Sequence, residues 1–150
     1  MERVLSTVAF SMFGRTLLLV LTTRDPSPGD WSIWAQTYAN AAVEHDVRSL
    51  FVVSEGGGPN SAQRRQVVEA IVAALGADNP DLFRTAICSD SAAARFITAA
   101  LGWLYAISNM KVFPADQRRE ALQFLHVEDD GQAPIMAAIP RLQEALRAHH

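Results

Sequence analysis

The sequence predicts a single-domain α/β fold with a mixed, mainly parallel sheet of about five strands flanked by helices. The first reason is the run 50–75, in which an apolar strand, a glycine loop and an amphipathic helix follow one another. The second is the alternation of strands and helices along the chain, which favours parallel strands joined by right-handed crossovers. The third is the length of 150 residues, which suits one domain with a substantial core.

Two strands and a helix are expected at the start of the chain. Apolar residues in Val4–Met12 and Thr16–Thr22 predict the strands, and the short link Phe13-Gly14-Arg15 predicts a β-hairpin. A loop with two prolines follows, and Asp30 is a good N-cap for the next helix. Packing against the sheet is the simplest explanation of the aromatic stripe on that helix, Trp31, Trp34 and Tyr38.

The central unit begins at Leu50–Val53, a continuous apolar run typical of a strand covered on both faces. Gly56-Gly57-Gly58-Pro59 interrupts that strand and allows a tight backbone path. Asn60 or Ser61 can cap the following helix, whose apolar positions recur at three- and four-residue spacing until Gly76 ends it.

Two more strands, Leu82–Cys88 and Lys111-Val112-Phe113, are predicted further along the chain. Between them, Ala92–Ile107 reads as a helix that is apolar nearly all the way round. Such a helix must be buried on more than one side, so we expect either the C-terminal segment or a second subunit to cover it. Pro114 then leads into a helix over Asp116–Leu125.

Residues 1–126 are expected to form the α/β domain, and 127–150 a linker and a C-terminal helical extension that packs on it. Val127–Pro134, which contains Glu128-Asp129-Asp130-Gly131, is interpreted as the linker. Pro140 is expected to kink or restart the helix that follows. The apolar positions of that helix are Ile135, Ile139, Leu142 and Leu146.

Composition excludes several classes of protein. The formal net charge of −3 argues against nucleic-acid binding driven by phosphate neutralisation. A single cysteine rules out an internal disulfide framework, and a reducing cytoplasm fits best. The most apolar runs contain charges or are too short for a membrane span, so no transmembrane segment is expected.

The predicted order and certain residues resemble the SpoIIAA-like group of STAS-related domains. Met110–Leu125, with its VF strand end, acidic helix start and EA…L pattern, is similar to the closing strand and helix of that group. Arg84–Cys88, followed by a loop and an apolar helix, is similar to the preceding unit. The resemblance spans roughly Arg3 to Leu125 and leaves out the segment after Val127.

The resemblance implies a regulatory or protein-interaction role, with a protein partner or a homodimer. In the anti-sigma-factor antagonists of this group, a partner kinase phosphorylates the serine of an Asp-Ser pair after the central strand. Ser61 is the matching position here, although Asn60 stands in place of the aspartate. Some members are grouped with lipid-binding Sec14-type folds, which implies an apolar ligand as the alternative.

The loops at two strand exits form the candidate site. In open α/β sheets, ligands favour the carboxyl ends of strands, and free amides at a helix N-terminus suit an anion. We therefore expect these loops to bind a protein partner or a small apolar or anionic ligand. Their residues are Ser54, Glu55, Gly56, Gly57, Gly58, Asn60, Ser61, Arg64, Ser89, Asp90, Ser91 and Arg95.

Simpler explanations compete with each candidate. The glycine loop lacks the lysine of a P-loop and does not read GxGxxG, so a structural turn is the favoured interpretation. A serine at position 61 is expected on capping grounds alone. Cys88 ends an apolar strand and is interpreted as a buried hydrophobe. No spacing predicts a metal site, a cofactor or a catalytic triad, and an enzyme of unknown reaction is the third hypothesis.

Overall fold

The computed structural model describes residues 1–76, 83–90 and 109–149, which contain six strands and four helices. The strands are β1 (Glu2–Val4), β2 (Ala9–Phe13), β3 (Thr16–Leu21), β4 (Ser49–Ser54), β5 (Arg84–Cys88) and β6 (Met110–Phe113). The helices are α1 (Pro28–Glu44), α2 (Ser61–Leu75), α4 (Arg118–Phe124) and α5 (Asp129–Arg147).

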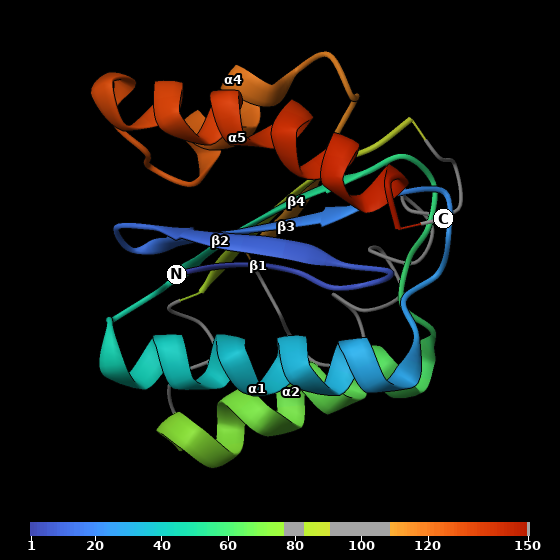
Figure 1. The fold of residues 1–150 in the computed structure, drawn as a ribbon. Helices are drawn as coiled ribbons and strands as arrows, with labels where there is room; N and C mark the ends of the chain where they lie inside the picture. The colour runs from blue at the N-terminus through green and yellow to red at the C-terminus, as the bar shows by residue number, and fades with distance from the viewer. Residues whose placement is uncertain (77–82, 91–108, 150) are drawn as a thin grey trace.

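The six strands form one mixed sheet in which neighbours follow the order of the sequence. β1, β2 and β3 pair antiparallel, and β3 to β6 pair parallel. Helices α1 and α2 cover one face, and α4 and α5 cover the other (Figure 1). The predicted α/β class and the hairpin around Gly14 are confirmed, because Phe13 pairs with Thr16.

Both faces of the sheet are buried, which explains the continuous apolar runs in β3 and β4. On β4, Leu50 and Val52 belong to the core beneath α1 and α2, whereas Phe51 and Val53 belong to the core beneath α4 and α5. The aromatic stripe of α1 packs as predicted. Its three residues are at most 4% exposed, and they are Trp31, Trp34 and Tyr38.

The sheet has one strand more than expected because the chain reverses within the segment predicted as the first strand. The amide of Leu5 donates to the carbonyl of Val8 at 2.8 Å, which closes a tight turn between β1 and β2. Thr7 within this turn is buried, and its amide and hydroxyl both donate to the carboxylate of Asp30. The turn is therefore held by a residue far along the chain.

The predicted N-cap of α1 is wrong by three residues. Ser27 is the N-cap, and its hydroxyl accepts from the amide of Asp30 at 3.2 Å. Pro28 occupies the first helical position, where a missing amide costs nothing. Asp30 instead uses its carboxylate to hold Thr7, at 2.6 Å from the hydroxyl oxygen.

The expected linker over 127–134 is also wrong, because α5 begins at Asp129 and runs unbroken to Arg147 with Pro134 and Pro140 inside it. α5 lies over β2 and β3 (Figure 1). Burial of its apolar stripe outweighs the two lost backbone hydrogen bonds. The stripe consists of Ile135, Ile139, Leu142 and Leu146, each at most 1% exposed.

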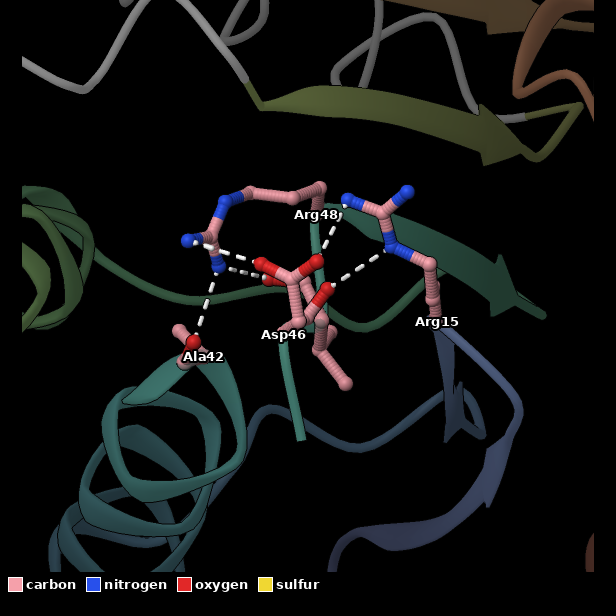
Figure 2. A network of polar contacts seen from close by, with 5 residues as sticks. Arg15, Ala42, Asp46 and Arg48 are labelled. Atoms are coloured by element: carbon pink, nitrogen blue, oxygen red, sulfur yellow. Dashed lines mark hydrogen bonds and ion pairs between the residues drawn. The ribbon is translucent and has the colours of Figure 1, made fainter. Parts of the chain in front are cut away.

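A polar network around Asp46 fixes the connection from α1 to β4, at the edge of the sheet where the parallel strands begin (Figure 2). The carboxylate of Asp46 pairs with Arg15 at 2.8 Å and with Arg48 at 3.0 Å. Arg48 also donates to the carbonyl of Ala42 at 2.8 Å, near the C-terminus of α1 where carbonyls lack partners. The network is therefore structural and lies away from the candidate loops.

Some features of the sequence prediction lie outside the described residues. They are the apolar helix Ala92–Ile107, the candidate site residues Ser91 and Arg95, and the first residue of the strand predicted over Leu82–Cys88. In the described ranges, no helix combines the length and the apolar character that crossing a membrane requires.

Candidate functional site

The glycine loop after β4 packs against the loop that follows β3. The hydroxyl of Ser54 accepts from the amide of Gly56 and donates to the carbonyl of Gly57. The amide of Gly57 donates to the carbonyl of Thr22 at 2.8 Å, and that of Gly58 donates to the carboxylate of Asp25 at 3.1 Å. The turn is thus tied to the backbone of Thr22 and to the side chains of Ser54 and Asp25, as the structural interpretation of this loop expects.

This arrangement leaves the loop poorly suited to holding an anion. An anion site built from backbone would need amides that point at the ligand with no other acceptor. Here those amides already donate within the protein, namely those of Gly56, Gly57, Gly58, Asn60 and Gln63. The free amides expected from the sequence are therefore not present at these five positions.

Helix α2 starts with a capping box. Asn60 is the N-cap, its side chain accepts from the amide of Gln63 at 2.8 Å, and the Gln63 side chain accepts from the amide of Asn60 at 3.0 Å. Of the two caps proposed from sequence, Asn60 is the one used. Ser61 is the first helical residue, and its side chain is left exposed at the surface.

Arg64 lies one turn further along α2 and reaches back to the start of the helix. One terminal nitrogen (Nη1) donates to the carbonyl of Pro59 at 2.8 Å, and the other (Nη2) donates to the hydroxyl of Ser61 at 3.1 Å. Its Nε is buried and meets no acceptor among the described residues. The guanidinium is therefore held in place by two bonds and keeps one unsatisfied donor.

Gln63 also locks the start of α2 to α1. The indole nitrogen of Trp31 donates to the Gln63 carbonyl at 2.7 Å, and the Gln63 side chain donates to the carbonyl of Pro26 at 3.0 Å. These contacts are buried. They fix the spacing between the first turns of the two helices that cover this face of the sheet.

The second candidate loop leaves β5, which pairs with β4 up to Val53 and Cys88, but its printed contacts run toward β6. Ser89 is buried, and its amide donates to the carbonyl of Phe113 at 3.0 Å. The carboxylate of Asp90 accepts from the amide of Ala115 at 3.1 Å. Both residues are thus joined to the end of β6. Glu55 points elsewhere again, since its carboxylate pairs with Arg147 of α5.

A cavity of about 180 Å³ lies between the sheet and helices α1 and α2. Four candidate residues line one part of it, namely Ser54 at the end of β4, Gly57 and Gly58 of the glycine loop, and Arg64 of α2. The rest of its described lining is almost entirely apolar. Those residues include Leu19, Leu21, Trp31, Trp34, Leu50, Val52, Val67, Val68, Ile71, Val72, Phe83 and Ile87.

Sequence reasoning missed the apolar lining of this cavity. The aromatic stripe of α1 and the apolar face of α2 were both visible as core-facing patterns. Periodicity tells which side chains turn inward but not whether their volumes fill the space between a helix and a sheet. No signal in the sequence points to a cavity here, because the stripe of α1 and the glycine loop come together only in the folded chain.

Cys88 ends β5 inside the core beneath α4 and α5. Burial raises the pKa of its thiol to about 11, so it stays protonated near neutral pH, as expected of a small buried hydrophobe. Within residues 1–76, 83–90 and 109–149, no group of three or more His, Cys, Asp or Glu side chains is placed to hold a metal ion.

Comparison with known proteins gives one family. Residues 27–126 match the model of a family described as SpoIIAA-like. The match begins at the N-cap of α1 and ends just after α4, so it includes the glycine loop, Ser61 and the cavity-lining helices. Among curated proteins, none matches the chain.

Proposed function

Because the chain belongs to the SpoIIAA-like family, we propose that it is a regulatory domain that binds a protein partner and is controlled by phosphorylation of Ser61. Domains of this family generally act in regulation and protein interaction. Control by phosphorylation is the more specific part of the proposal, and it rests on Ser61 alone.

The observation that carries the proposal is the position of Ser61. Its side chain is exposed at the first residue of α2, so that a kinase can reach it without unfolding the domain. A phosphate there adds a charge of about −1.5 to −2, which the positive end of the helix dipole tolerates. Arg64, whose Nη2 already lies 3.1 Å from the Ser61 hydroxyl, supplies a counter-charge. Modification would therefore change the surface while leaving the fold intact.

The test is native mass spectrometry of the protein purified gently from its own host. Wild type, Ser61→Ala and Ser61→Asp are compared, with Ser32→Asp as the control because Ser32 is also exposed on a helix of this face. We expect a retained protein partner with all variants except Ser61→Asp. Equal retention by Ser61→Asp contradicts the switch, and a bare monomer in every case contradicts the interaction function.

The cavity favours a second candidate function, the binding of a small apolar ligand. An apolar cavity of about 150 Å³ is large enough to take a benzene-sized molecule. The cavity here is of comparable size, about 180 Å³, and is lined by two tryptophans and by aliphatic side chains. Calorimetric titration with decan-1-ol tests this function. Saturable binding with one site supports it, and the absence of binding heat at every concentration up to the solubility limit of decan-1-ol contradicts it.

A further inference from the structure

We propose that the cavity binds a single-chain amphiphile with an anionic head group, and that Arg64 pairs with that head. The proposal rests on the second candidate function, because it names the ligand class for the same cavity. Three observations support it: the shape of the cavity floor, the position of the charged lining residue at one end of the cavity, and the incomplete hydrogen bonding of Arg64.

The floor of the cavity is one face of the parallel strands. Every second residue of two neighbouring strands faces the cavity. These residues are Leu50, Val52 and Ser54 on β4, and Thr85 and Ile87 on β5. Because a strand rises about 3.3 Å per residue, the floor from Leu50 to Ser54 runs for about 13 Å. Its side chains are apolar over most of that length. An elongated apolar floor suits a single hydrocarbon chain laid along the strands.

Charge occurs at one end of the cavity. Among its described lining residues, Arg64 is the one that carries a charge, and it stands beside the glycine loop with Ser54, Gly57 and Pro59. Leu50 and Thr85 line the far end, where the strands begin. A ligand with one polar end would therefore place that end at Arg64 and its chain toward Leu50.

The bonding of Arg64 selects the sign of the head group. The Nη1 and Nη2 groups hold the guanidinium against Pro59 and Ser61, so little side-chain entropy remains to be lost on binding. Nε is buried without an acceptor in the described structure, and such a donor is unfavourable until it is satisfied. A carboxylate supplies an acceptor and the opposite charge together, whereas an alcohol supplies only the acceptor.

The test is calorimetric titration of the full chain with decanoate below its critical micelle concentration and with decan-1-ol below its solubility limit. Arg64→Gln is compared with Arg65→Gln, which removes the same charge from the next, exposed position of α2. We expect the wild type and Arg65→Gln to bind decanoate about tenfold more tightly than decanol. Arg64→Gln should lose that preference and keep its affinity for decanol. Arg64→Lys, which retains charge but lacks Nε, should fall between them.

The possible results separate the two proposals. Equal affinity of the wild type for decanoate and decanol overturns the anionic head group while leaving the ligand-binding function in place. Equal loss of the preference in Arg65→Gln overturns the role of Arg64, because the effect is then one of net charge. Failure of both probes to bind wild type overturns this inference together with the second candidate function. If Arg64→Gln is unfolded by circular dichroism, Arg64→Lys decides, and a full preference for decanoate in that variant overturns the role of Nε.

Discussion

Gly57 lies directly against the carbonyl of Arg24, and a Cβ at position 57 would stand 2.0 Å from that oxygen. The contact joins the loops that leave β3 and β4, and the amide of Gly57 strengthens it by donating to Thr22. A Cβ added at Gly58, the next residue, would have no other atom within 4 Å. One glycine of the three is therefore required by packing, and its neighbour is not.

We expect Gly57→Ala to lower the free energy of unfolding by about 1–3 kcal/mol, because backbone rather than a flexible side chain must move to admit the methyl group. Gly58→Ala is the matched control and should change stability by less than about 0.5 kcal/mol. Urea denaturation followed by tryptophan fluorescence measures both. Equal effects of the two substitutions would contradict the close packing of the loops.

Asp30 should make the protein sensitive to acid. Burial disfavours its charged form, but hydrogen bonds from Thr7 and Ser27 outweigh this and hold the pKa of Asp30 below its ordinary value of 3.8. A carboxyl whose pKa is lower in the folded chain stabilises the fold above its unfolded pKa, and that contribution is lost as the pH falls through the folded pKa. Asp30→Asn should cost roughly 1 kcal/mol at neutral pH.

Denaturant titrations of wild type and Asp30→Asn from about pH 6 to about pH 2 check this prediction. The difference in unfolding free energy between them should shrink as the pH falls below 3.8. Asp25→Asn serves as a control, since Asp25 is an exposed carboxyl that bonds only the loop amide of Gly58 in the described contacts. A difference that stays constant over the whole range would show that the Asp30 charge is not involved.

The thiol of Cys88 should be protected in the native protein. With its pKa raised to about 11 by burial, it is mostly un-ionised at pH 8, and the thiolate is the reactive form. We expect native labelling by a disulfide reagent to be at least about 100-fold slower than labelling in urea. The same shift predicts that stability falls as the pH rises from 9 toward 11, because the unfolded chain then loses the proton first. Similar labelling rates in both states would contradict the burial of Cys88.

Local patterns in the sequence were sufficient for most of the fold. Leu50–Val53 was recognisable as a covered strand because both of its faces carry apolar side chains, and Asn60 as a helix start because its own side chain forms the cap. The prediction was wrong where a contact with a residue distant in the sequence determines the role of a side chain. Asp30 was available as a cap, but Thr7 engages its carboxylate instead.

The candidate site was harder to predict than the fold. The glycine loop was correctly placed at a strand exit, yet its partner, Arg24, could not be read from local sequence. Glu128-Asp129-Asp130-Gly131 suggested a linker, and Pro140 suggested a kink or a restart because proline disfavours helix interiors. Burial of the stripe of α5 overrides that preference. The cavity depends on unfilled volume between packed elements, which no periodicity encodes.

Helix α5 should contribute to the stability of the whole domain although it lies beyond the residues matched by the family. Ile139 of α5 is fully buried in the core between that helix and the sheet, and Ile139→Ala should cost about 2–5 kcal/mol. Met136→Ala, at a position 37% exposed on the same helix, should cost far less. Thermal unfolding should remain one transition with a lower midpoint for Ile139→Ala. A separate early transition, with the main one unchanged, would show that α5 is an independent extension.

Ser61 and Arg64 should couple phosphorylation to the occupation of the cavity. The guanidinium of Arg64 donates to the Ser61 hydroxyl, 3.1 Å from Nη2, and Arg64 also lines one end of the cavity. An acidic group at position 61 competes with a ligand carboxylate for that cation, so Ser61→Asp should weaken decanoate binding by about tenfold and leave decanol unaffected. Calorimetric titration measures both affinities, with Ser32→Asp as the charge control. An undiminished affinity of Ser61→Asp for decanoate would mean that the two functions do not share this residue.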